Sequence, residues 1–491
     1  MNRNNERHFN QVPETHVSRT RFKRDQNILT TFDAGKLIPF YVDEVLPGDT
    51  FSTDTAAIIR MTTPKYPVLD DAFIDFYYFY CPNRILWDNF RHFMGEADET
   101  PWMPTQTYRV PKIIVEGNST EENKKGPKEG SILDYMGVPT KINGKIEINA
   151  LPIRAYIKIW NEYFRDQNLE NQAAYFADDE DTIYNDAGEN EKELLKNART
   201  GGRCLPVNKF HDYFTSCLPY PQRGPDVTLP MTGNAQIVWP NDADTMANGD
   251  IFKKGTGNLE NIPINTDMTI AASRNNNKSG KALVLFGGQK NPSEINYSVV
   301  YLGADLGSVT AATINDLRKA VAVQQYYEAL ARGGSRYREQ VQALWDVVIS
   351  DKTVQVPEYL GGRYPINMSQ VVQTSSTTTD SPQGNTAAVS VTPFNENSFT
   401  KSFEEHGFII GVCCVRHDHT YQQGIERMWS RQDALDYYYP QFANLGEQAV
   451  KVKEIYTGKE LTKENTEEVF GFQEAWSEYR MKPNRVAGKF R

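Results

Sequence analysis

Three side chains near the end of an apolar run could bind a metal ion. Cys413, His417 and His419 would share one face of a strand that covers residues 407–417 and continues just beyond. Thiolate and imidazole are the ligands that zinc prefers. On a flat strand this spacing spreads the ligand atoms apart, however, and no second cluster completes the set. The pattern favours buried strand cysteines followed by histidines at the strand end, so we predict no metal ion.

A second group of residues could form a cysteine nucleophile with its base. His211 and Asp212 lie shortly before Cys217, and a thiol near an imidazole is the arrangement of cysteine hydrolases. With 7 histidines in 491 residues, such a neighbourhood arises easily by chance. The sequence also has no phosphate loop of the form GxxxxGKS or GxxxxGKT, no GxSxG turn, no HExxH motif and no spaced CxxC pair. We therefore predict no catalytic residues, no cofactor and no enzymatic activity.

Four consecutive acidic residues, 178–181, could bind a calcium ion through their carboxylates. They lack the glycine and the alternating oxygen ligands of a calcium loop. A run of like charges is more often a solvated loop. We predict that these residues face solvent and bind no ion.

The charge of the chain is divided unequally along its length. With 53 Lys and Arg against 63 Asp and Glu, the net charge is −10, which repels phosphate. Residues 1–24 carry six basic residues against two acidic ones, and residues 476–491 carry five against one, so each end is +4 and the remainder is −18. Basic tails flanked by aromatic residues suit contact with phosphates and bases, although they can also be solvated tails. The candidate DNA contacts are Arg19, Arg21, Lys23, Arg24, Arg480, Lys482, Arg485, Lys489 and Arg491.

The elements that would position these residues are mostly strands. Residues 37–42, 51–61 and 73–81 are rich in β-branched and aromatic side chains, and each run ends at a Pro-Gly-Asp, Thr-Pro or Pro-Asn breaker. The run 73–81 is apolar on both faces, as in a central strand covered on each side. Residues 407–417 form another apolar strand. These patterns predict an antiparallel β-sandwich.

Helical spacing appears in four places. A short helix is expected near 87–94, and a better one at 151–164, where the apolar stripe is Ile153, Tyr156, Ile157, Trp160 and Phe164. Thr313 and Asp316 form an acidic variant of the capping box and begin a third helix, followed by a fourth at 336–347. The residues expected on the buried side of the third helix are Ile314, Leu317, Val321 and Leu330.

Composition indicates a globular chain with one long insertion. The chain is 39% apolar and 12% aromatic, has no long linker, and has no apolar run near the roughly 18 residues that cross a bilayer. A polar N-terminus and an odd count of five cysteines suggest a soluble protein made in a reducing cytoplasm. Residues 224–308 are rich in Asn, Gly, Asp, Thr and Ser, with strand-like pieces at 282–286 and 297–301. Such a tract is usually functional or disordered, and its strand pieces favour a small structured subdomain.

Four sequence blocks follow one another along the chain. The first covers 32–96; the second, at 209–224, reads KFHDYFTSCLPYPQRG; the third, at 357–362, reads PEYLGG. The fourth covers 437–490 and includes YYYPQFANLGEQ and EYRMKPNRV. In content and order these blocks resemble the major capsid proteins of the gokushovirus branch of the Microviridae, small tailless phages with single-stranded DNA.

The resemblance implies a fold and a domain plan. The fold would be mainly β: a single eight-stranded viral jelly roll, an antiparallel β-sandwich with large loop and helical insertions. Residues 1–31 would be a basic N-terminal arm and 32–491 one capsid domain, ending in the basic tail 476–491. Insertions would lie at about 83–208 and 224–308, the latter projecting from the threefold axes for host attachment.

The resemblance also implies a function. Sixty copies would form a T=1 icosahedral shell around circular single-stranded DNA. Other partners would be scaffolding, DNA-condensing and pilot proteins and a host surface receptor such as a glycan, with no membrane insertion. The protein would lie in the virion after assembly in the cytoplasm of the host bacterium.

A different function class stays open from the residues alone. Jelly rolls also occur in lectins, so the chain could be a carbohydrate-binding or hydrolytic β-sandwich. A glycosidase needs a pair of catalytic carboxylates, and no recognisable signature of such a pair is present. Sugar binding would also leave the basic, aromatic-flanked tails unexplained.

Overall fold

The fold is given by a computed structural model. It describes residues 18–62, 70–96, 107–117, 126–142, 144–186, 190–228, 236–238, 269–271, 284–286, 303–305, 313–362, 366–368, 390–443, 446–458 and 467–490. The chain divides into two compact units, one formed by Met1–Pro221 with Ala331–Arg491 and the other by Gln222–Leu330. The tract 224–308 lies within the second unit. The assignment of residues 32–491 to one capsid domain stays a prediction.

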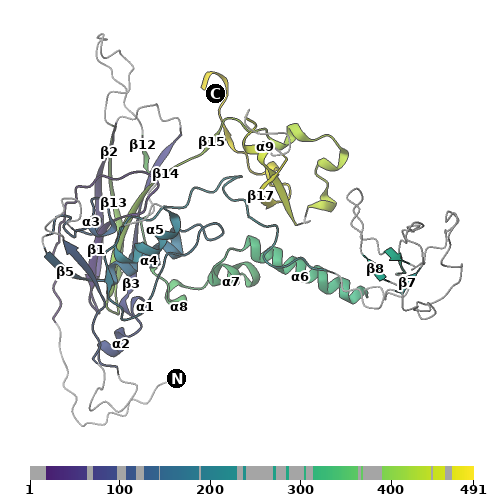
Figure 1. Cartoon of the computed structure of the whole chain (residues 1–491). Helices are drawn as coiled ribbons and strands as arrows, with labels where there is room; N and C mark the ends of the chain where they lie inside the picture. Colours follow the sequence, from purple (N-terminus) through teal and green to yellow (C-terminus); the bar gives the residue numbers. More distant parts are fainter. Residues whose placement is uncertain are drawn as a thin grey trace, which may run out of the picture. The chain divides into compact units, whose positions relative to one another are not determined.

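A five-stranded antiparallel sheet forms the centre of the first unit (Figure 1). Its order is β1 (Ile38–Val45), β14 (Gly407–His417), β3 (Ala72–Pro82) and β11 (Glu358–Gly361), and β12 (Ile366–Met368) also pairs with β3. Strands β14 and β3 pair along their whole length, because both are unbroken runs of strand-forming residues. The predictions of strands at 73–81 and 407–417 are confirmed.

A two-stranded ribbon packs on one face of this sheet. It pairs β2 (Thr50–Met61) with β13 (Ser390–Ser402). The hydroxyl groups of Thr55 on the ribbon and Tyr78 on the sheet lie 2.6 Å apart. Between the layers lies a cluster of buried side chains from both, namely Val45, Tyr78, Tyr80, Phe399, Phe403 and Ile409. Two antiparallel layers packed in this way are consistent with the β-sandwich expected from the sequence.

The other face of the central sheet is covered by helix α4 (Leu151–Ile159), which continues as a π-helical turn, Trp160–Phe164. The predicted helix and its buried stripe are confirmed. The Phe164 ring meets Tyr77 of β3 edge-on at 5.2 Å. The Tyr156 hydroxyl donates to the carbonyl of Leu37, 2.8 Å away. Strand β3 is therefore buried on both faces, as its sequence predicts.

Short elements surround α4. Helices α1 (Asn83–Leu86) and α2 (Phe90–Phe93) replace the single helix expected near 87–94. A small sheet joins β5 (Gly144–Asn149), β4 (Lys112–Gly117) and β6 (Thr182–Ile183). Helices α3 and α5 cover Ile132–Tyr135 and Glu191–Asn197.

The acidic run 178–181 is bound to its surroundings. Asp178 forms an ion pair of 3.1 Å with Arg154, whose side chain is almost fully buried. Asp179 accepts a hydrogen bond from Asn89 at 2.8 Å, and Asp181 accepts one from the backbone of β4 at 2.8 Å. The prediction that this run faces solvent holds for residues 179–181, which are exposed. It is wrong for Asp178, which is half-buried and accepts a hydrogen bond from Arg154.

The described residues of the second unit form two short strand pairs and all but the last two residues of a long helix. Strand β7 (Gln236–Val238) pairs with β10 (Gly303–Asp305), and β8 (Thr269–Ala271) pairs with β9 (Val284–Phe286). Strand β9 falls within the expected 282–286, whereas 297–301 lies outside the described residues.

Helix α6 (Ile314–Arg332) begins as predicted, since Thr313 and Asp316 exchange hydrogen bonds of 3.1 Å. Its expected buried side is wrong: Ile314, Leu317 and Val321 are exposed, and Leu330 is only half-buried. Apolar spacing marks one face of a helix, but it does not show that the same chain covers that face.

The C-terminal lobe, residues 420–490, follows the sheet within the first unit. It contains a parallel pair, β15 (Thr420–Tyr421) with β18 (Asn484–Arg485), and an antiparallel pair, β16 (Glu447–Lys451) with β17 (Val469–Glu474). Helix α9 spans Val452–Ile455. A small core joins this lobe to the 213–217 turn through Tyr213, Phe214, Cys217 and Val450.

Two further helices precede the lobe in the sequence, α7 (Tyr337–Trp345) and α8 (Asp351–Val354). Among the described residues, no helix combines the length and apolarity needed to cross a membrane.

Candidate functional site

The three potential zinc ligands do not meet. Cys413, on β14 of the central sheet, is buried in the main core. The rings of His417 and His419 lie 5.2 Å apart at the strand end, where His417 is exposed. Burial, aided by the neighbouring His417, lowers the pKa of His419. No group of three His, Cys, Asp or Glu in the described part of the chain is placed to hold a metal ion.

Asp212 and Cys217 have structural roles. The Asp212 carboxylate accepts hydrogen bonds from the backbone of Phe214 and Thr215, at 2.9 and 2.7 Å, and from the Tyr421 hydroxyl at 2.7 Å. Burial acts to raise the pKa of Asp212, but these hydrogen bonds outweigh it and hold the pKa below its ordinary value. Burial raises the pKa of Cys217 to about 12, so its thiol is protonated and is no nucleophile at neutral pH. All five cysteines are buried and free.

Most of the basic residues proposed for the N-terminal arm contact the chain itself. Arg24 forms an ion pair of 3.0 Å with Asp43 of β1, and Lys23 one of 2.9 Å with Asp25. Arg19 donates to the carbonyl of Gly48. Arg21 is exposed and has no ion-pair partner among the described residues. The arm from residue 18 onward is therefore partly neutralised.

The same holds for the C-terminal tail. Lys482 and Arg485 both pair with Glu426, at 3.1 and 3.0 Å, and Arg480 pairs with Glu474 at 2.6 Å. Lys489 is exposed, and no ion pair is found for it within the described ranges. Arg491 lies outside the described residues. The sequence pattern gave no sign that Glu426 anchors two of these cations, because it lies more than fifty residues away.

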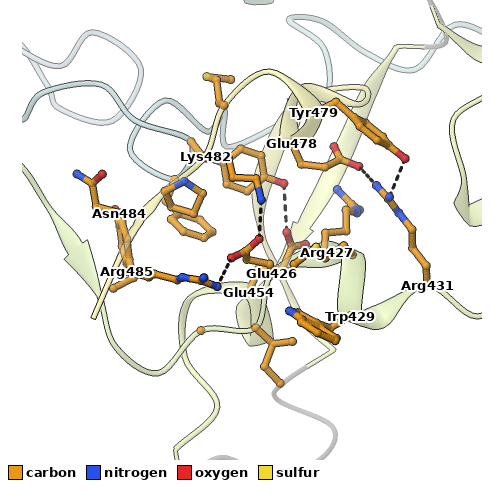
Figure 2. A pocket seen from close by; sticks show the side chains of 18 residues that line it. Glu426, Arg427, Trp429, Arg431, Glu454, Glu478, Tyr479, Lys482, Asn484 and Arg485 are labelled. Carbon is orange, nitrogen blue, oxygen red and sulfur yellow. Dashed lines mark hydrogen bonds and ion pairs between the residues drawn. The ribbon is translucent and has the colours of Figure 1, made fainter. Parts of the chain in front are cut away.

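A pocket of about 490 Å³ opens in the C-terminal lobe, between residues 424–431 and 478–485 (Figure 2). On one side Arg431 donates to the Glu478 carboxylate and to the Tyr479 hydroxyl, both at 2.7 Å. The Arg431 guanidinium also lies 4.6 Å from the centre of the Tyr479 ring. The pocket therefore has a polar wall, built around a largely buried ion pair.

The carboxylates that line this pocket are already engaged. Glu478 is paired with Arg431, and Glu426 bridges Lys482 and Arg485 (Figure 2). Glu454 accepts a hydrogen bond of 3.1 Å from the Tyr213 hydroxyl. A glycosidase needs one free acid and one free nucleophile or base. The arrangement suits binding better than hydrolysis.

Sequence reasoning missed this pocket. Its lining comes from four separate segments, near residues 213, 425, 454 and 480. No single segment carries a recognisable motif. The only available signal was the density of aromatic residues between 425 and 442.

Comparisons with known proteins agree with one another. The sequence model of the family described as "Capsid protein (F protein)" matches residues 10–491. The chain is 40% identical, over its full length and 85% of the relative's, to capsid protein VP1 of Bdellovibrio phage phiMH2K. It is 36% identical to capsid protein VP1 of Chlamydia phage 1, over 98% of this chain and 86% of that protein. Capsid protein VP1 of Spiroplasma virus 4 is also 36% identical, over 98% of this chain and 84% of that protein.

These matches reach nearly from end to end and include both the sheet and the C-terminal lobe. The resemblance seen in four sequence blocks is thus confirmed over the intervening residues as well. The chain therefore belongs to the F family of capsid proteins, in the gokushovirus-like branch of the Microviridae, and is a structural protein of a bacteriophage virion.

Proposed function

We propose that sixty copies of this protein form a T=1 icosahedral shell around a circular single-stranded DNA genome. The observation that carries the proposal is the match to capsid protein VP1 of Bdellovibrio phage phiMH2K over the full length of the chain. Assembly would take place in the cytoplasm of the host bacterium. Weak contacts suffice, because each contact is repeated around a closed symmetric shell.

The strand order supports an eight-stranded jelly roll as the shell-forming domain. The late strand β14 lies between the early strands β1 and β3, and β2 pairs with the late strand β13. Such nesting of early and late strands is typical of Greek-key folds. Strands β1, β14, β3 and β11 would form one layer of the roll, and β2 with β13 would belong to the other.

The genome would meet only a few cations of each copy. Arg21 and Lys489 are the best placed to contact phosphate, because most other candidates have carboxylate partners within the chain. A chain of net charge −10 does not neutralise a genome. The proposal therefore includes a basic DNA-condensing protein, together with scaffolding and pilot proteins.

Residues 224–308 would project from the shell and attach the phage to a host receptor such as a glycan. Support comes from the division of the chain, because a unit that is compact by itself can be removed without opening the central sheet. Deleting residues 232–292 should leave shell formation intact and impair infection. Particle yield and plaque counts measure the two effects, and a deletion that prevents assembly would contradict the proposal.

The test of the shell itself is co-expression with the neighbouring genes, followed by nuclease treatment and electron microscopy. The expected result is uniform small icosahedral particles that protect single-stranded DNA. Monomers or small oligomers without protected DNA would contradict the proposal and direct attention to glycan binding.

A further inference from the structure

A stretch of the C-terminal lobe carries large apolar side chains that the chain does not cover. We call residues 425–442 the aromatic arm. All of them are described, and every one is exposed or half-buried. Its exposed apolar side chains are 39 to 72% accessible, and they are Ile425, Met428, Trp429, Leu435, Tyr437, Tyr438 and Tyr439. Soluble proteins rarely leave so many apolar side chains together at the surface without a binding role.

The composition of the arm is largely that of an interface. It contains five aromatic residues and two arginines, no lysine, and three acidic residues, Glu426, Asp433 and Asp436. Aromatic residues, Met and Arg are enriched in protein interfaces, whereas Lys, Glu and Asp are depleted, so the aromatic residues, the arginines and the lack of lysine match an interface and the acidic residues do not. A surface that met a nucleic acid would instead need unpaired cations. In the arm, Arg431 is paired with Glu478, and Arg427 donates to the Ala449 carbonyl at 2.7 Å.

The exposed area fits a partner of protein size. Taking about 200 Å² for each large side chain, the seven exposed residues leave roughly 700 Å² accessible. A standard interface covers about 800 Å² on each partner. The accessible apolar area of one arm is therefore close to the area that one partner contributes to a standard interface.

The arm is held in place although it is not buried. Its three turns are short 3-10 helices: Arg427–Ser430, Ala434–Asp436 and Pro440–Phe442. The Asp436 carboxylate accepts a hydrogen bond of 3.0 Å from the backbone of Asp433. The Tyr438 ring meets Trp476 edge-on at 5.7 Å. Polar and ring contacts therefore fix the arm before any partner binds, which lowers the entropy cost of binding.

The pocket of Figure 2 adds a concave feature beside the arm. Met428, Trp429 and Arg431 of the arm line it, together with Tyr479. Interface hot spots are typically aromatic or arginine side chains that fill or border such pockets.

From these observations we infer that the aromatic arm is a contact between copies, with a second copy of this chain packing on Trp429 and its neighbours. The inference rests on the proposed shell and names one surface that holds it together. A shell protein must cover apolar area through its neighbours, and the arm is a stretch of the described residues in which uncovered area, aromatic side chains and fixed shape coincide.

The test is a photoreactive benzophenone side chain in place of Trp429, combined with the variant Trp429→Ala. Tyr220 is the matched control, because it is 73% exposed against 72% for Trp429 and lies outside the arm. Illumination should yield an adduct of two copies from position 429 and little from position 220. Trp429→Ala should raise the concentration needed for assembly about tenfold or more, whereas Tyr220→Ala should not. The thermal unfolding of both variants should match the unchanged chain.

Several results would overturn the inference: an adduct within one chain, with DNA or with a different protein; equal yields at both positions; or normal assembly of Trp429→Ala. Normal assembly of this variant would leave the shell proposal standing. If the unchanged chain forms no shell, the proposed function fails, and the adduct still reports whether two copies meet at the arm.

Discussion

The central sheet and the aromatic arm contain similar residues in opposite environments. In β14, the first eight residues are buried, and its apolar side chains pack between neighbouring strands and α4. In the arm, no residue is buried, although five of its 18 residues are aromatic. The apolar side chains of the sheet are covered by other parts of the same chain, whereas those of the arm remain accessible to solvent.

Backbone geometry explains the difference. Long strands pair with one another, so the side chains of each strand pack in a row against those of the strands beside it. The arm consists of three turns of three or four residues and the irregular segments between them, so it has no long strand that could bury its side chains against a neighbour. Stability in the sheet should therefore depend on buried contacts within the chain. Stability near the arm should depend on polar contacts and, in the proposed shell, on other copies.

The largest expected effect is in the sheet. Asp75 of β3 is fully buried, forms an ion pair with Arg416 of β14 and accepts a hydrogen bond of 3.1 Å from Tyr77. Asp75→Ala leaves the Arg416 guanidinium with the Tyr77 hydroxyl but without its carboxylate partner, and should lower the free energy of unfolding by about 3–5 kcal/mol. Urea unfolding measures this. A loss below about 1 kcal/mol would show that the sheet does not depend on this pair.

An intermediate effect is expected at the small core beneath the lobe. Asp212→Asn weakens the hydrogen bonds to Thr215 and Tyr421 and should cost about 1–3 kcal/mol at neutral pH. Because the pKa of Asp212 is below its ordinary value of 3.8, this stabilisation is present above about pH 4 and is lost as the pH falls through the pKa of the folded state.

Unfolding of the unchanged chain and of Asp212→Asn at pH 7 and at pH 2.5 measures this dependence. The difference between the two chains should narrow at the lower pH. A difference that stays constant with pH would contradict the role given to the carboxylate.

The smallest effect is expected at the surface of the lobe. Arg485 pairs with Glu426, but its side chain is 69% exposed. Arg485→Ala should change the free energy of unfolding by no more than about 1 kcal/mol, because solvent screens such pairs. Thermal unfolding in low and moderate salt provides the measurement. A loss comparable with that of Asp75→Ala would remove the contrast between sheet and lobe.

Sequence patterns predicted the sheet better than the lobe. The strand 407–417 and the stripe on α4 were predictable, because periodic apolar residues determine local structure and burial together. The buried side predicted for α6 was wrong, since Ile314 is exposed. The ion pairs of Lys482 and Arg485 with Glu426 were not predictable, because they depend on how distant segments meet.

Hydrogen exchange on the free chain and on assembled particles tests the central claim most directly. The claim is that this capsid protein buries the apolar side chains of its sheet by itself, whereas those of the aromatic arm are buried only by other copies. The account predicts that β3 and β14 are protected in both states, and that residues 425–442 gain protection only in the particle. Equal exchange of residues 425–442 in the two states would contradict it.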